Sequence, residues 1–342
     1  MRRQEIEDDT FRLDGSNVFY LLLSSSNSLY LQKKHKSHME KFEINILGCG
    51  AALPTPKRLS SSQVVNIREK LFMLDCAEGI QMALRKSRIA FPKIQAVFLT
   101  HLHGDHVFGL IGMLSTFGLL GRIQDLHIYG PHDLQRLFQP QIDYFCADSP
   151  FRIILHEIDT TTAQVIYEDR SVTISTLPLS HRVPCCGYLF CEKPTPRHIR
   201  RDMIDYYHIP TSQINNIKAG MDWTTEDGTL IPNDRLTTPP DPVRSYAYCT
   251  DTAYRPSLAD LLQDVTCLYH EATFTSEHAL LAKKTHHSTA TQAAQIALAS
   301  HAHQLILGHF SSRYPSEAPL LQEAQTLFPN TLLAEDGMKL RL

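Results

Sequence analysis

Four residues of the kinds that bind metal ions lie within six positions of one another. They are His101, His103, Asp105 and His106, and they follow an apolar run at residues 96–99 that predicts a buried strand. Four side chains at this spacing cannot all face one ion. The turn is therefore expected to point His101 and His103 one way and Asp105 and His106 the other. Imidazole and carboxylate ligands suit two adjacent divalent metals, with zinc preferred over manganese or iron. A histidine-rich surface turn is the alternative, but four such residues rarely coincide at one strand end.

The same design recurs at four later apolar segments, each of which predicts a strand followed by a chemically useful side chain. They are residues 172–177 before His181, 246–250 before Asp251, 265–269 before His270 and Glu271, and 305–308 before His309. An α/β fold gathers its chemistry at the carboxyl ends of its strands. One such histidine alone would indicate only a core or surface residue, whereas the recurrence predicts that these side chains meet at one rim.

Several shorter patterns predict the elements around that rim. Residues 42–47 alternate like a half-buried strand and lead into a loop at 48–62, while residues 72–74 predict another strand. Apolar residues at 110, 113, 114 and 117 predict an amphipathic helix. Asp75 either orients a ligand histidine or caps the helix expected from Ile80, and the sequence leaves both open.

Near the C-terminal end, Ser288 or Thr289 is expected to cap an alanine-rich helix that ends at about Ser300. For the preceding His286 and His287 we favour surface or structural roles over metal binding.

Composition bounds the remaining possibilities. A chain of 342 residues can form one large core or one domain with an insertion, and its net charge of −3 provides no overall attraction to nucleic acid. The eight cysteines form no C-x-x-C pair and predict reduced core thiols in a cytoplasmic protein. No apolar run approaches the ~20 residues that cross a bilayer, so no membrane association is expected. Residues 1–38 predict a dispensable extension before a domain at 39–342.

Residues 192–244 interrupt the regular pattern with prolines and charges. A segment of this length without periodicity favours a protruding functional arm, although a tolerated surface insertion is the alternative. Its basic residues are Lys193, Arg197, Arg200, Arg201 and Lys218.

Taken together, these motifs resemble the metallo-β-lactamase fold and, more narrowly, the short form of the ribonuclease Z family. The resemblance runs from about Glu40 to the C-terminus. The motifs that carry it are H-x-H-G-D-H at 101–106, P-L-S-H at 178–181, T-D-T at 250–252, H-E-A-T-F at 270–274 and G-H-F-S-S-R-Y at 308–314. The resemblance implies an αββα sandwich of two sheets flanked by helices, with an inserted arm.

The resemblance also implies roles for individual residues. One zinc would be held by His101, His103 and His181, the second by Asp105, His106 and His309, and Asp251 would bridge them. Asp105 would accept a proton from the attacking water. His270, steadied by Glu271, would donate one to the leaving oxygen. The activity would be removal of the 3′ trailer from precursor tRNA, leaving a 3′-hydroxyl.

In this family the arm grips tRNA, and the enzyme is often a homodimer. The basic arm residues would therefore contact phosphates, which supply affinity without sequence information. Thr211 and Ser212 stand where the family's arm usually has Gly-Pro, which puts the conformation of the arm in doubt. Two other functions remain open: a hydrolase of small phosphodiesters or thioesters on the same scaffold, and a non-catalytic RNA-binding subunit. An arm of about fifty residues disfavours the first, and the complete ligand set disfavours the second.

Overall fold

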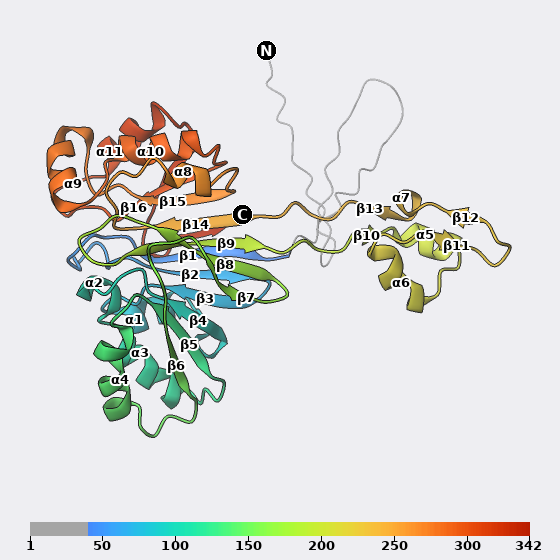
Figure 1. Cartoon of the computed structure of the whole chain (residues 1–342), viewed down its shortest axis with the longest axis horizontal. Coiled ribbons are helices and arrows are strands. Elements are labelled where there is room, and N and C mark those ends of the chain that lie inside the picture. Colours follow the sequence, from blue (N-terminus) through green and yellow to red (C-terminus); the bar gives the residue numbers. More distant parts are fainter. Residues whose placement is uncertain (1–39) are drawn as a thin grey trace, which may run out of the picture. The chain divides into compact units, whose positions relative to one another are not determined.

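Two seven-stranded sheets form the centre of the part of the chain that the computed structural model describes, residues 40–342 (Figure 1). The predicted extension at residues 1–38 lies outside the described residues. The first sheet contains, in spatial order, β18 (Lys339–Arg341), β1 (Phe42–Gly48), β2 (Ser62–Ile67), β3 (Lys70–Leu74), β4 (Ile94–Phe98), β5 (Leu126–Gly130) and β6 (Ile153–Glu157). The second contains β17 (Thr331–Leu333), β16 (Leu305–Gly308), β15 (Cys267–Glu271), β14 (Ser245–Cys249), β9 (Cys186–Glu192), β8 (Val172–Pro178) and β7 (Val165–Glu168).

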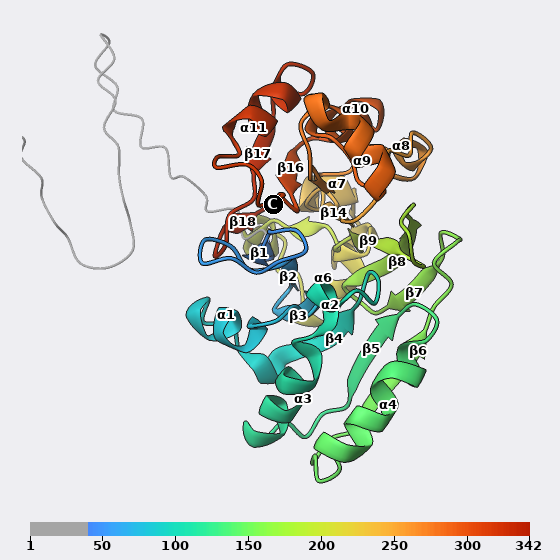
Figure 2. The ribbon, with the colours of Figure 1, turned by 90° about the vertical axis from the view of Figure 1, so that its left-hand side faces the viewer.

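Helices cover the outer face of each sheet, which gives the αββα sandwich that the resemblance implies (Figure 2). Beside the first sheet are α1 (Ile80–Lys86), η1 (Phe91–Lys93), α2 (Gly104–Val107), α3 (Leu110–Leu119) and α4 (Leu134–Phe145). Beside the second are α8 (Leu258–Leu261), η2 (Ser276–His278), α9 (Ala279–Thr285), α10 (Ala290–Ala299) and α11 (Ala318–Gln325). Within residues 40–342 no helix is long and apolar enough to cross a membrane.

Alternating side chains explain why each sheet is covered on both faces. In β3, Phe72 and Leu74 pack between the sheets, while Leu71 and Met73 pack under the outer helices. An aromatic cluster fills the space between the sheets, with the ring of Phe98 centred 5.0 Å from Tyr129 and 5.3 Å from Tyr188. Burying both faces of a strand fixes its register, because a slip by one residue would exchange the two faces.

Most of the predicted elements are present. The amphipathic helix is α3, and its four predicted core residues are fully buried. The alanine-rich helix is α10, which Thr289 caps in a reciprocal arrangement with Gln292. All eight cysteines are free, as predicted. One strand was misplaced: β15 ends at Glu271, so His270 and Glu271 lie inside the strand rather than after it.

Residues 193–243 leave the second sheet between β9 and β14 and carry small elements of their own (Figure 1). These are β10 (His198–Ile199), α5 (Arg201–Tyr206), α6 (Thr211–Lys218), β11 (Trp223–Thr224), β12 (Leu230–Ile231), α7 (Asn233–Leu236) and β13 (Thr237–Thr238). Ile209, Ile217, Ile231 and Leu236 form a separate apolar cluster. We call residues 193–243 the arm. Thr211 begins α6 directly after Pro210, so a helix starts at the position where the family's Gly-Pro pair is absent.

Candidate metal centre and active site

The structure brings all seven predicted metal ligands together at one rim of the sandwich. His101 and His103 lie in the turn after β4, and α2 supplies Asp105 and His106. The other three ligands follow the ends of β8, β14 and β16, and they are His181, Asp251 and His309. The side chains form two adjoining groups whose donor atoms lie within 4.8 Å of one another in each group: His101, His103, His181 and Asp251 in one, and Asp105, His106 and His309 in the other.

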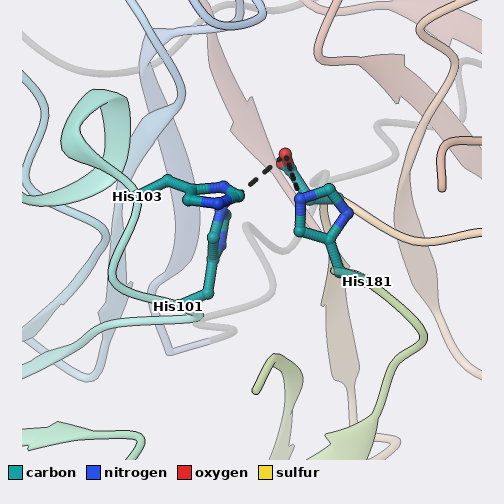
Figure 3. Close-up of side chains that lie close together, drawn as sticks. His101, His103 and His181 are labelled. Carbon is teal, nitrogen blue, oxygen red and sulfur yellow. Dashed lines mark ion pairs between the residues drawn. The ribbon is translucent and has the colours of Figure 1, made fainter. Parts of the chain in front are cut away.

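Asp251 lies between these two groups. Its Oδ2 is 3.8 Å from the Nε2 atoms of both His101 and His181 (Figure 3). Its Oδ1 is 3.3 Å from Nε2 of His106 and 3.0 Å from Nε2 of His309. Each carboxylate oxygen therefore faces a different set of imidazoles, which is the geometry that a ligand shared by two cations requires.

Four of the imidazoles are held so that Nε2 points into the cluster while Nδ1 is bound elsewhere. The Nδ1 atoms lie 3.1 Å from the Thr100 hydroxyl (His101), 2.8 Å from the Asp75 carboxylate (His106), 3.1 Å from the His286 carbonyl (His181) and 2.9 Å from the Thr273 hydroxyl (His309). Within residues 40–342, the buried Nε2 atoms of the same four rings have no hydrogen-bond partner. Buried polar atoms without partners are costly. A protein group bound to the other ring nitrogen is typical of histidines that bind metals, so the donor set fits divalent cations.

Asp75 resolves one alternative that the sequence left open. Its side chain does not cap α1, which begins after Gly79 with no side-chain cap. It contacts His106 instead, and it also accepts hydrogen bonds from the hydroxyls of Thr100 at 3.0 Å and Tyr248 at 3.1 Å. Asp75, which directly follows β3, therefore orients the candidate ligand His106 and also contacts residues beside β4 and in β14.

Asp105 carries a negative charge at the edge of the cluster. Burial raises the pKa of its carboxyl group, but the adjacent His106 outweighs this and lowers the pKa to about 2. The backbone N–H of Ala52 donates a hydrogen bond of 3.1 Å to Oδ2. The loop predicted at residues 48–62 thus reaches the site through its backbone rather than through a side chain.

His270 contacts Glu271 through the backbone carbonyl of Glu271 rather than through its carboxylate. Neighbouring residues of a strand point to opposite faces of the sheet. Nδ1 of His270 lies 2.8 Å from the Glu271 backbone carbonyl, whereas the Glu271 carboxylate lies 2.8 Å from Nδ1 of His287. That carboxylate also accepts hydrogen bonds from the backbone N–H groups of Thr252 at 2.7 Å and Ser288 at 3.0 Å.

His287, for which the sequence analysis favoured a surface or structural role, lies beside the candidate metal ligands. Its ring stacks on His309 with 5.3 Å between centroids, and it forms a third possible metal-binding group with Asp251 and His309. Burial lowers the pKa of its imidazole, but the Glu271 carboxylate outweighs burial and raises the pKa to about 9. The only signal in the sequence was its place just before the Thr289 cap, which anchors it beside β15.

Three of the five basic arm residues are paired with acidic side chains. Lys193 pairs with Glu168 at 2.5 Å, Arg197 with Asp234 at 2.6 Å and Arg200 with Asp202 at 2.9 Å. The side chains of Arg201 and Lys218 form no ion pair within the described part of the chain. The arm contains six basic and seven acidic residues, so its charge is balanced rather than positive.

Comparisons with known proteins agree with this geometry. A family model described as anti-Pycsar protein Apyc1 matches residues 42–142. A Bacteroides fragilis protein named ribonuclease Z is 53% identical over 304 residues, which cover 89% of this chain and 100% of that protein. A Porphyromonas gingivalis ribonuclease Z is 46% identical over the same shares of both chains.

Among solved structures, human tRNase Z, short form, superposes with a TM-score of 0.64 at 26% identity and covers 87% of this chain and 98% of the human chain. With close relatives aligned along their whole length and the same sandwich in a solved structure, the chain belongs to the ribonuclease Z family.

Proposed function

We propose that this protein is a metal-dependent endoribonuclease that removes the 3′ trailer from precursor tRNA and leaves a 3′-hydroxyl on the tRNA. The observation that carries the proposal is the rim cluster, in which seven candidate ligands converge in a member of the ribonuclease Z family. The likeness to human tRNase Z supports tRNA as the substrate.

The metal ions are proposed to be two zinc ions per subunit, with manganese or iron as possible substitutes. His101, His103 and His181 would hold one, Asp105, His106 and His309 the other, and Asp251 would bridge them. Two such ions supply a nucleophile at neutral pH and neutralise charge on the attacking and leaving oxygens.

The residues of the chain perform the proton transfers. Asp105 would accept a proton from the attacking water, and the lowered pKa of its carboxyl group supports this role. His287, rather than His270, would protonate the 3′ oxygen of the tRNA as the bond from that oxygen to phosphorus breaks. Its partner Glu271 keeps the imidazole charged and in place. The trailer then departs with the phosphate on its 5′ end.

The arm is proposed to recognise the shape of the tRNA rather than its base sequence. Its balanced charge and internal ion pairs leave few free cations, and Arg201 and Lys218 are the best candidates for phosphate contacts. Lys193, Arg197 and Arg200 would serve mainly to hold the arm's structure. Homodimerisation and a cytoplasmic location are proposed from the family alone.

The test is cleavage of a 3′-extended precursor tRNA by the purified protein, with the products mapped to single-nucleotide resolution and their end groups identified. One cut next to the discriminator base, with a 3′-hydroxyl on the tRNA, is expected. Turnover of a small phosphodiester without any cleavage of precursor tRNA would overturn the proposal and favour a hydrolase of small substrates.

A further inference from the structure

The root of the arm contains a buried cluster of charges that plays no part in the metal centre. Glu192 is the last residue of β9, and Arg244 directly precedes β14. Both are more than nine-tenths buried. The Arg244 guanidinium grips the Glu192 carboxylate with two parallel hydrogen bonds of 2.8 Å, from Nε to Oε2 and from Nη2 to Oε1. We call this pair the root clamp.

The root clamp ties the arm to both sheets. Although β9 and β14 belong to the second sheet, Arg244 also donates to the backbone carbonyls of Glu40 at 2.7 Å and Leu342 at 3.0 Å, which flank strands of the first sheet. Arg68, in the turn between β2 and β3, donates to the Lys193 carbonyl at 2.7 Å. Both connections to the arm are therefore fixed from the opposite sheet at the point where they leave the domain.

The two connections beyond the root clamp are stiff. Residues 193–197 contain two prolines and residues 239–243 contain three. Proline fixes φ and removes a hydrogen-bond donor, so these segments behave as semi-rigid spacers rather than flexible linkers. They lead to a part of the arm with its own apolar cluster. The direction in which the arm points is therefore set by the contacts of Glu192 and Arg244, because the proline-containing segments transmit it to the part of the arm that holds the apolar cluster.

Stability alone does not account for a buried ion pair here. Replacing such a pair by apolar side chains of similar volume is often neutral or stabilising, because the desolvation of two charges offsets their attraction. What a bidentate Arg–carboxylate pair adds is a defined geometry.

We propose that Glu192 and Arg244 are positioning residues that set the direction of the arm and thereby the affinity for precursor tRNA, with no part in bond cleavage. This proposal rests on the proposed function of the arm as a tRNA-binding element. It predicts that loss of the root clamp weakens substrate binding while leaving the chemistry of the metal centre intact.

The decisive variant is the double substitution Glu192→Met/Arg244→Met in the full chain, which keeps the volume and removes the directional contacts. Arg244→Lys is the conservative variant, since it keeps the charge but loses the fork. Arg122→Met is the matched control: Arg122 is a similarly buried arginine that donates to the carbonyls of Pro92, Ile94, Gln124 and Asp125, away from the arm. Thermal melting establishes that each variant is folded.

The first readout is independent of tRNA. Spin labels are attached through unnatural amino acids at Thr229 in the arm and Ser149 in the domain, and pulsed electron paramagnetic resonance gives the distance distribution between them. The wild type and Arg122→Met should give one narrow distribution, the double variant a distribution about twice as wide, and Arg244→Lys an intermediate one. An unchanged width in the double variant would overturn the proposal.

The second readout is single-turnover cleavage of precursor tRNA. The enzyme concentration that gives the half-maximal rate should rise about tenfold in the double variant. The saturating rate and the turnover of a small phosphodiester should stay within about twofold of the wild type. A wider distribution with unchanged half-saturation would also overturn the proposal. If the wild type fails to cleave precursor tRNA, the proposed function fails, and the distance distributions alone judge the root clamp.

Discussion

The metal centre and the arm differ in how strongly residue types determine what each region does. At the rim, seven side chains from four strand ends and one short helix meet within two groups of donor atoms, and four of the five histidines turn Nε2 inward. In the arm, three of the five basic residues predicted to bind phosphate are instead paired with acidic neighbours.

The physical reason lies in the number of constraints. A metal site needs a few atoms of defined type at distances of about 2 Å from the ion, so the right residues at several strand ends leave few alternatives. Binding of a polyanion needs only an excess of positive charge on an accessible surface. Whether a lysine or arginine is free depends on which acids the fold places beside it.

The largest effect should come from Asp251→Ala, which removes the carboxylate that lies between the two ligand groups. Loss of both metal contacts should lower the cleavage of precursor tRNA and of a small phosphodiester alike, by about a thousandfold or more. The metal content, measured by mass spectrometry, should also fall. Asp260→Ala, at an exposed carboxylate of α8, is the control and should leave both quantities unchanged.

The next effect distinguishes His287 from His270. His287→Asn should lower the saturating rate on precursor tRNA by about a hundredfold, because the leaving sugar oxygen needs a proton. The same variant should cleave a nitrophenyl phosphodiester nearly as fast as the wild type, since nitrophenolate leaves without one. Equal losses on both substrates would remove His287 from the role of proton donor, and a larger loss on precursor tRNA in His270→Asn would return that role to His270.

A smaller effect, confined to precursor tRNA, is expected when residues 194–243 are replaced by a short glycine-serine linker. Binding should weaken by about tenfold to a hundredfold, while the turnover of a small phosphodiester is spared, because the arm contributes no ligand to the metal centre. A parallel loss of both activities would mean that the arm supports the catalytic domain itself.

The smallest effects should separate the free cations from the paired ones. Arg201→Ala and Lys218→Ala should each weaken tRNA binding by about threefold. Each should also reduce the steepness of the plot of log binding constant against log salt concentration by about one counterion released. Arg197→Ala and Arg200→Ala, whose partners are acidic arm residues, should change the salt dependence less. Salt titrations of tRNA binding measure all four, and equal slopes would contradict the distinction.

Local patterns predicted the main strands, helices and candidate ligands, whereas the αββα arrangement was expected from the resemblance to a known family. Apolar strands followed by His or Asp indicated the candidate ligands, and the helical spacing at Leu110 to Phe117 identified α3. The role of Asp75 and the pairing of Glu271 with His287 could not be predicted, because they depend on which way a side chain points from its strand. His287 is 36 residues from Asp251 in sequence but adjoins it in the fold.

The measurement that tests the central claim most directly is single-turnover cleavage of a 3′-extended precursor tRNA and of a small phosphodiester by three proteins: wild type, Asp105→Ala and the arm replacement. The account predicts that the wild type cleaves both, that Asp105→Ala cleaves neither, and that the arm replacement loses affinity only for precursor tRNA. Cleavage of precursor tRNA that does not depend on Asp105 would contradict it.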